Sequence, residues 1–434
     1  MWTLQWVSPL NPLGKDLEMR QAAHNDRSGT LPLSGIRVVS LEHALAAPIC
    51  TRHLADLGAE VIKIERPGEG DFSRGYDTFV YGESTYFLWL NRGKSSFALD
   101  VKAKGADQVL NRLIRSADVI VQNLAPGAAA RAGLDYETVR KINPRAIVAD
   151  ISGYGEGGSF ENKKAYDMLI QAESGLISIN GSEDTPARVG LSVADLSTGL
   201  YTQTAILAAL VRRGQTGEGA NVKVAMLDAL AEWMTYPMYR HAYNGSRIPR
   251  LPMNNPNIAP YGAHATSDGI VIFSIQNERE WQTFCEVVMA QPELTLHKDY
   301  KTNSLRILNA EKLTQLIETK FSDKSTQEVV HLLDSGGIAN GRLNQAKDLW
   351  EHSQLKERDK WRDVKIPGGH TIRALLPPFI FSDFEAVMGD VPALGEQTEK
   401  VLRTLDFNEL EIDHLFEQGT VAGQRQALEK NSRS

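Results

Sequence analysis

Cysteine is scarce in this chain of 434 residues, where only Cys50 and Cys285 occur. They form no CxxC pair and have no histidine-rich neighbourhood, so a disulfide framework is excluded and a zinc-type metal site is not expected. Long hydrophobic runs are also lacking, because no stretch approaches the roughly 18 apolar residues of a membrane-spanning helix. We therefore expect neither a metal nor a membrane partner.

An excess of basic charge is missing too. The chain has 47 lysines and arginines against 54 aspartates and glutamates, which gives a net charge of −7. A general nucleic-acid binder presents a surface dominated by Lys and Arg, so no nucleic-acid partner is expected. A small anionic ligand is compatible with this charge, because local fields and oriented amides govern its binding. The length predicts two or three domains.

The first 30 residues lack the arginine-rich, acid-poor composition of a mitochondrial leader, since their basic residues are matched by acidic ones. We expect residues 1–30 to form a flexible N-terminal extension. The predicted compartment is the cytoplasm, with the mitochondrial matrix as the alternative.

Short apolar runs alternate with helical patterns between residues 36 and 152. Strands are predicted at 36–41, 60–64, 119–121 and 146–151, and helices at 102–118 and 135–142. Most of these strands are too apolar to be buried on one face only, which indicates a parallel sheet covered on both faces. The sequence therefore predicts an α/β fold with a Rossmann-like large domain.

The rest of the chain predicts a smaller α/β domain after a proline-rich connection without periodicity. Further strands are expected at 221–224, 269–275 and 375–381, and further helices at 196–213, 227–239, 278–289, 311–321, 325–333, 396–405 and 409–417. The large domain is predicted to comprise 31–240 and 375–434, with a linker at 241–261 and the small domain at 262–374.

A glycine pattern after one strand invites a dinucleotide interpretation. Gly153, Gly155 and Gly158 satisfy G-x-G-x-x-G directly after the strand at 146–151. However, the next residues are polar and begin no amphipathic helix, and no strand ending in an acidic residue follows at the spacing that holds a ribose. We interpret the segment as a loop whose backbone approaches a neighbour closely.

Basic residues follow several of the predicted strands. Arg66 begins the loop RPGEGD, and Lys102, Arg131 and Lys164 lie near other strand ends. Each alone is typical of a solvated surface, but ligands bind at the carboxyl edge of parallel sheets, and a guanidinium suits phosphate. His43 lies in the first turn among small residues that leave room for a ligand group.

Asp195 lies between a short apolar run and a helix, within GLSVADLSTG. Aspartate is a common helix N-cap, so a purely structural role is one interpretation. The other is a nucleophile, because a helix N-terminus favours an ionised carboxylate and its amides stabilise an oxyanion. The spacing alone leaves both interpretations open.

Taken together, the motifs resemble those of class III (family III) CoA-transferases, a group that includes formyl-CoA:oxalate and carnitine-related CoA-transferases and the α-methylacyl-CoA racemases. The resemblance runs from about Leu33 to the C-terminus, with the motifs in the family's order and spacing. They are HALAAP at 43–48, LGAEVIKIERPGEGD at 57–71, LNRGKSSFALDVK at 90–102, VQNLAPGAAARAGLD at 121–135, GYGEGG at 153–158, AYD at 165–167, GLSVADLSTG at 190–199 and GEGANVKVAMLDAL at 217–230.

The resemblance implies roles for individual residues. Asp195 matches the catalytic aspartate of the transferases. Arg66, Lys102 and Arg131 would meet the phosphates and adenine of CoA, and Leu99 would pack against the base. The full set of implied CoA contacts is His43, Ala46, Arg66, Leu99, Lys102, Arg131 and Lys164. The family fold is a homodimer of two interlocked rings, with no tightly bound cofactor and with acyl-CoA as a substrate.

The implied activity is transfer of CoA from an acyl-CoA donor, with succinyl-CoA preferred, to a small carboxylic acid through an aspartyl-CoA thioester. The acceptor is expected to be a dicarboxylate of the itaconate, mesaconate, citramalate or glutarate type. Its second carboxylate would need a cation, for which Arg74, Arg250 and His264 are candidates.

Two alternatives remain. An α-methylacyl-CoA racemase needs two acid–base groups on opposite faces of the α-carbon, and Asp167 alone does not supply them. A CoA-binding protein without chemistry is the second alternative, against which the intact context of Asp195 argues.

Overall fold

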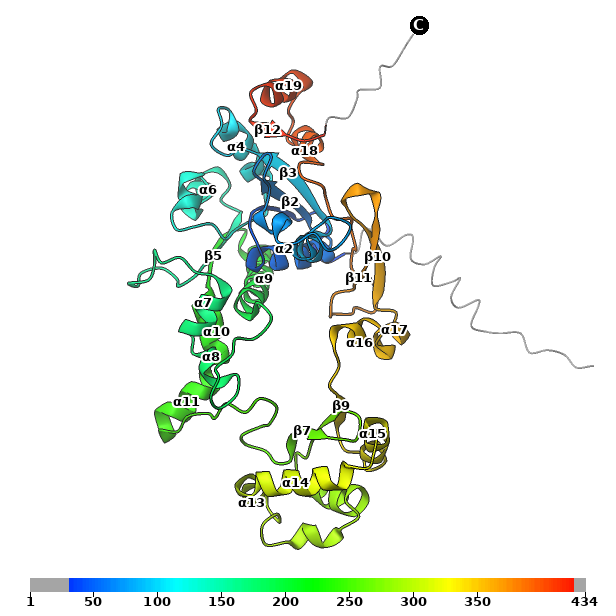
Figure 1. Cartoon of the computed structure of the whole chain (residues 1–434). Coiled ribbons are helices and arrows are strands. Elements are labelled where there is room, and N and C mark those ends of the chain that lie inside the picture. Colours follow the sequence, from blue (N-terminus) through cyan, green and yellow to red (C-terminus); the bar gives the residue numbers. More distant parts are fainter. Residues whose placement is uncertain (1–30, 425–434) are drawn as a thin grey trace, which may run out of the picture. The chain divides into compact units, whose positions relative to one another are not determined.

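The computed structural model describes residues 31–424, and the chain divides into two compact units (Figure 1). Unit 1 comprises the residues up to Ile170, Ser192–Leu230 and the residues from Lys360 on. Unit 2 comprises Gln171–Leu191 and Ala231–Asp359. The expected extension at 1–30 lies outside the described residues.

Unit 1 is built on a seven-stranded sheet in the order β12-β3-β2-β1-β4-β5-β6. All neighbours are parallel except β12, which runs antiparallel to β3. The order from β3 to β6 is that of dinucleotide-binding sheets, in which successive strands are added on one side of β1 up to β3 and then, from β4 on, on its other side. The strands are β1 (Arg37–Leu41), β2 (Glu60–Glu65), β3 (Lys94–Leu99), β4 (Val119–Gln122), β5 (Ile147–Ser152), β6 (Ala220–Ala225) and β12 (Val421–Ala422).

Helices cover both faces of this sheet because successive strand residues point to opposite sides. In β1, Val39 packs with one set of helices and Val38 with the other. The first face is covered by α4 (Ala106–Ser116), α6 (Tyr136–Ile142), α18 (Thr398–Thr404) and α19 (Glu409–Glu417). The second face is covered by α2 (Ala46–Asp56) and α9 (Val193–Thr216), as can be followed in Figure 1.

A smaller apolar cluster joins an antiparallel hairpin to the rest of unit 1, with Phe87 and Leu88 packed against Val364 and Ile366. The hairpin consists of β10 (Trp361–Lys365) and β11 (Thr371–Leu375), with η4 (Pro367–Gly369) at its turn. The remaining elements that begin in unit 1 are η1 (Phe72–Gly75), α3 (Thr85–Asn91), α5 (Ala128–Arg131), α7 (Asp167–Glu173) and α10 (Met226–Trp233).

Unit 2 packs helices against a three-stranded antiparallel sheet. Its core is rich in aromatic side chains, including Phe273, Trp281, Phe284 and Phe321. The strands are β7 (Tyr261–Ala265), β8 (Ile270–Ser274) and β9 (Asn340–Arg342). The helices are α8 (Leu176–Ile179), α11 (Thr235–Asn244), α12 (Glu278–Thr283), η2 (Phe284–Val288), η3 (Pro292–Leu296), α13 (Asn303–Leu308), α14 (Ala310–Phe321), α15 (Thr326–Ser335), α16 (Ala346–Trp350) and α17 (Ser353–Glu357).

The predicted α/β fold with a parallel sheet covered on both faces is confirmed. Two local predictions are wrong, and one parallel strand was missed. The helix expected at 227–239 is broken at Met234, the apolar run at 375–381 holds only the last residue of β11, and β3 was not predicted as a strand. Strand β3 begins with the residues KSSF, which are too polar to predict a buried strand. Lys94 and Ser96 are nevertheless buried, because Lys94 pairs with Glu42 and Ser96 hydrogen-bonds to Glu65.

The two units also differ in extent from the expected domains. The hairpin from Lys360 on belongs to unit 1 because it packs on Phe87 and Leu88. Residues 171–191 group with unit 2, where the Arg250 guanidinium donates to the carbonyls of Ser178 and Ser182.

Candidate active site

Five of the predicted ligand-binding residues follow five different parallel strands. His43 follows β1, Arg66 follows β2, Lys102 follows β3, Arg131 follows β4 through the short helix α5, and Lys164 follows β5. Because parallel strands end at the same edge of a sheet, these side chains originate along one edge. The switch in strand order between β1 and β4 places His43 where ligands of such sheets bind.

The cations along this edge are exposed. Arg66 pairs with Glu69 at 3.0 Å, and both side chains are about 70% exposed. Lys102, Arg131 and Lys164 are also exposed. An exposed ion pair contributes little stability, so Arg66 can exchange Glu69 for a ligand phosphate at small cost.

The two apolar residues of the predicted set are buried. Ala46 is the first residue of α2 and is 2% exposed. Leu99 ends β3, is also 2% exposed and contributes its side chain to the core. A contact between Leu99 and an adenine ring would therefore have to use main-chain atoms.

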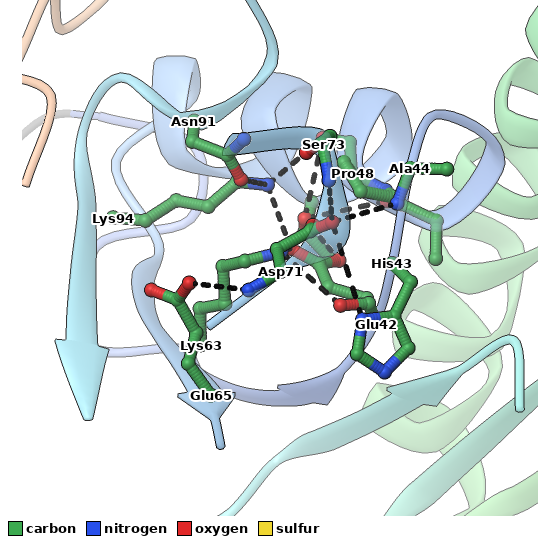
Figure 2. Close-up of polar contacts among 12 residues, drawn as sticks. Glu42, His43, Ala44, Pro48, Lys63, Glu65, Asp71, Ser73, Asn91 and Lys94 are labelled. Atoms are coloured by element: carbon green, nitrogen blue, oxygen red, sulfur yellow. Dashed lines mark hydrogen bonds and ion pairs between the residues drawn. The ribbon is translucent and has the colours of Figure 1, made fainter. Parts of the chain in front are cut away.

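His43 lies half-buried at the carboxyl end of β1, with its ring stacked on Phe72 at a centroid distance of 5.2 Å. Its Nδ1 lies 4.0 Å from Oδ1 of Asp71 (Figure 2). Burial lowers the pKa of His43, and the Asp71 charge opposes this only in part. The imidazole is therefore neutral near pH 7, able to donate one hydrogen bond and accept another.

Asp195 lies in the first turn of α9, not at its N-cap. The N-cap is Ser192, whose side chain makes no capping bond. The free amides are instead met by Asp167, whose Oδ1 accepts from the amide of Ala194 at 2.8 Å and from that of Asp195 at 3.4 Å. The capping role that the sequence allowed for Asp195 thus belongs to Asp167, which leaves the Asp195 carboxyl without that task.

The charge state of Asp195 also differs from expectation. Burial, together with the nearby Asp167 charge, raises the pKa of Asp195 to about 7. The prediction that the helix N-terminus keeps this carboxyl fully ionised is therefore wrong, because desolvation and like-charge repulsion outweigh the helix dipole. Near neutral pH both the acid and the carboxylate are populated.

A close helix contact brings the start of α9, which carries Asp195, against the start of α2, where Leu196 packs on Leu45 and Ile49. Gly199, one turn after Asp195, lies against α2, and a Cβ there would come within 2.2 Å of Ile49 Cγ2 and 2.4 Å of the Ala46 carbonyl oxygen. Only glycine permits this approach. The first turn of α2 therefore lies beside the second turn of α9 in unit 1.

Sequence reasoning missed a buried charge cluster beneath this turn. Lys63 and Asp71 are 2.7 Å apart, as are Lys94 and Glu42, and all four side chains are buried (Figure 2). The signal was present, because Lys63 stands between two buried isoleucines in a strand whose faces are both covered. A lysine at such a position requires a buried partner.

The three candidates for binding a second carboxylate are engaged or neutral. Arg74 donates to Glu65 from both Nε and Nη2 at 2.8 Å, and Arg250 donates to main-chain carbonyls of unit 2. His264 lines a cavity of about 500 Å³ in unit 2, and burial lowers its pKa to about 4. None of the three offers an unengaged positive charge.

Among residues 31–424, no group of three or more His, Cys, Asp or Glu side chains is arranged to hold a metal ion. Within the same range, no helix combines the length and apolar character needed to cross a membrane.

Known proteins of one family are similar to this chain over most of its length. The family model described as CoA-transferase family III matches residues 33–398. Succinyl-CoA:glutarate CoA-transferase of Mus musculus is 33% identical over 401 residues, covering 92% of each chain. Succinate–glutarate CoA-transferase of Agrobacterium fabrum is 32% identical, covering 86% of this chain and 96% of its own. A formyl-CoA:oxalate CoA-transferase of Rhodopseudomonas palustris is 31% identical, covering 91% and 99%.

The solved structures agree with this assignment. A CAIB/BAIF family protein from Brucella suis superposes with a TM-score of 0.77 at 32% identity, covering 86% of this chain and 99% of that one. The resemblance seen in the sequence motifs is confirmed. The chain belongs to CoA-transferase family III and is an enzyme of that class.

Proposed function

We propose that this enzyme moves CoA from succinyl-CoA to a small dicarboxylic acid, and that Asp195 carries CoA in between as an aspartyl thioester. The supporting observation is the half-buried Asp195 carboxyl in the first turn of α9, one turn before the contact of Gly199 with α2, where Asp167 rather than Asp195 accepts from the free amide of Ala194. Relatives named for succinyl-CoA and glutarate make glutarate the first acceptor to test. Itaconate, mesaconate and citramalate are the other acceptors of this size.

The CoA would lie along the carboxyl edge of the sheet. Arg66, Lys102, Arg131 and Lys164 supply exposed cations there for its phosphates. His43 and the start of α2 follow the central strand β1, so they lie at the middle of this edge. The Leu99 contact is proposed to use the main chain at the end of β3.

The donor half-reaction begins with attack of the Asp195 carboxylate on the succinyl thioester carbonyl, which forms a mixed anhydride and releases CoA thiolate. The thiolate then attacks the aspartyl carbonyl, and succinate leaves as a carboxylate. The product is the aspartyl-CoA thioester.

The acceptor half-reaction reverses these steps with a different acid. The carboxylate of the acceptor attacks the aspartyl thioester and releases CoA thiolate, leaving an anhydride between Asp195 and the acceptor. The thiolate attacks the acceptor carbonyl, which yields the new acyl-CoA and restores the Asp195 carboxylate. One thioester replaces another, so the thioester free energy is conserved.

We also propose that the enzyme acts as a homodimer of interlocked subunits, as the family resemblance implies. Light scattering after size exclusion should give twice the chain mass of 48.0 kDa. A monomer at all concentrations would contradict this arrangement.

The test of the proposed function incubates the purified enzyme with succinyl-CoA and one dicarboxylate at a time, with acyl-CoA products read by mass spectrometry. The expected product is the acceptor's CoA ester, formed with one succinate per ester and absent in Asp195→Asn. Deuterium uptake at the α-carbon of a 2-methylacyl-CoA without any acid would instead select a racemase. Binding of CoA with no turnover of any substrate would select a CoA-binding protein.

A further inference from the structure

The turn that presents His43 is held by side chains from β2 and from the loop that follows it. The main-chain carbonyl of Glu42 accepts from Lys63 Nζ at 3.2 Å. The amide of Ala44 donates to Asp71 Oδ1 at 3.2 Å. His43 stands between these two anchored residues, so its position depends on contacts made by β2 and by the loop that follows it.

The turn needs such anchors because its backbone is strained. Ala44 has a φ of 60°, in the left-handed region that residues with a side chain rarely adopt. His43 adds a third anchor, since its amide and carbonyl both hydrogen-bond to the Asn123 side chain at 2.9 Å. Without the anchors, the backbone would relax toward an ordinary conformation and move His43.

The anchoring side chains belong to a buried network in which three acids balance three bases (Figure 2 shows most of it). Lys63 bonds to Asp71 at 2.7 Å, and Asp71 is 0% exposed. Buried ion pairs seldom stabilise a fold more than apolar side chains of the same volume would. Their presence under a strained turn therefore points to a positioning role. The network consists of Glu42, Lys63, Glu65, Asp71, Arg74 and Lys94.

On the basis of the proposed function, we propose that Asp71 and Lys63 are positioning residues for CoA, because they hold the turn at 42–44 in the conformation that presents His43. Asp71 is fully buried, so its influence on a ligand passes through the protein. It acts on His43 from two sides. Its Oδ1 accepts from Ala44, and the same oxygen caps η1 at Ser73, which places Phe72 against the imidazole.

The test uses Asp71→Asn. Both carboxylate oxygens of Asp71 accept hydrogen bonds, one from Lys63 and the other from the amides of Ala44 and Ser73. The asparagine amide has only one accepting oxygen, so the variant must lose either the hydrogen bond from Lys63 or those from the amides of Ala44 and Ser73.

The matched control is Asp56→Asn at the last residue of α2. Asp56 is 1% exposed and bonds to Arg92 at 2.7 and 3.0 Å, so this variant also leaves a buried cation short of a partner. It makes no contact with the turn at 42–44. Any effect of lost buried charge alone should therefore appear equally in both variants.

The measurement is the dissociation constant for CoA by titration calorimetry at a temperature where each full-length variant is folded. Asp71→Asn is expected to weaken CoA binding by about tenfold, whereas Asp56→Asn stays within about twofold of the parent. In a His43→Ala background, Asp71→Asn should add less than about threefold, because its effect passes through His43. Should Asp71→Asn fail to fold, Lys63→Met with Asp71→Asn removes both charges together and takes its place.

Equal losses in Asp71→Asn and Asp56→Asn, or an undiminished loss in the His43→Ala background, would overturn the positioning role alone. A parent enzyme that binds CoA without transferring it would contradict the proposed function and leave the positioning role standing on the binding data. A parent that does not bind CoA at all would contradict both.

Discussion

The charged form of Asp195 is destabilised in the folded enzyme, and this suits a nucleophile. Burial and the Asp167 charge raise its pKa to about 7. A carboxylate with few hydrogen bonds and a like charge nearby gains more from attacking an acyl group than a fully solvated one does. The same residue is then less favourable for folding, as functional residues often are.

The first prediction concerns pH. Only ionised Asp195 attacks the thioester, so kcat/KM for succinyl-CoA should rise with pH and level off above a pKa of about 7. Asp167→Asn retains an oxygen for the amide of Ala194 but removes the charge, so the pKa of Asp195 should fall. The rise in rate should then move to lower pH. Superimposable pH–rate profiles for parent and variant would show that Asp167 does not act on the nucleophile.

The second prediction concerns stability. The folded pKa of Asp195 lies above its unfolded value, so the residue destabilises the fold increasingly as pH rises from about 4 to 7 and by a constant amount beyond. Asp195→Asn removes this penalty, which after solvent screening is on the order of 1–2 kcal/mol. Its Tm should exceed that of the parent by roughly 2–4 °C at pH 8 and match it at pH 4. A variant less stable than the parent at pH 8 would contradict the assignment.

At the scale of elements, the approach of α9 to α2 decides where Asp195 lies. Gly199 faces the Ala46 carbonyl and Ile49, and no larger residue fits between the two helices. The same helix has Gly214 near its other end, where a Cβ would meet nothing within 4 Å. Substitutions at these two glycines therefore distinguish the effect of helix packing from the effect of helix propensity.

The third prediction follows from this pair. Gly199→Ala should destabilise the enzyme by about 1–3 kcal/mol, because the added methyl meets backbone that cannot rotate away. It should also lower kcat by moving Asp195 away from the His43 turn. Gly214→Ala should be neutral or stabilising by up to about 1 kcal/mol with unchanged kinetics. Denaturant titration and steady-state kinetics of both variants test this prediction. Equal stability and equal kcat in the two variants would contradict the close contact at Gly199.

Sequence patterns found most elements of unit 1 because apolar periodicity there is regular. Helix α9 was predicted at 196–213 and is observed from Val193 to Thr216. Strand β3 was missed because its inward residues include Lys94 and Ser96, which are satisfied by partners distant in sequence. The side chain that caps the start of α9 was not predictable for the same reason, since Asp167 lies 27 residues before Ala194.

At the scale of the whole molecule, the proposed CoA site was predictable to the extent that it depends on topology. The loops after five parallel strands share one edge, so the basic residues that follow those strands could be grouped from the sequence. The charge state of Asp195, the glycine contact with α2 and the buried network beneath His43 could not. Each depends on burial and on neighbours that only the folded chain brings together.

The fourth prediction tests the edge as a binding surface. Arg66→Ala and Arg131→Ala should each raise KM for succinyl-CoA by about tenfold with little change in kcat, because the lost contacts are made equally in ground and transition states. The salt dependence of KM should also weaken. Arg115→Ala, an exposed change in the last turn of α4 before β4 begins, is the control and should leave KM unchanged. If Arg66→Ala and Arg131→Ala had the same KM for succinyl-CoA as Arg115→Ala, CoA would not bind along this edge.

The most direct test of the account is to trap the covalent intermediate. The enzyme is mixed with succinyl-CoA without an acceptor, quenched in acid and digested, and the peptides are sequenced by mass spectrometry. The account predicts a gain equal to CoA minus water on the peptide that contains Asp195, located at that residue, with none in Asp195→Asn. An adduct on another residue, or full transfer by Asp195→Asn, would contradict the account.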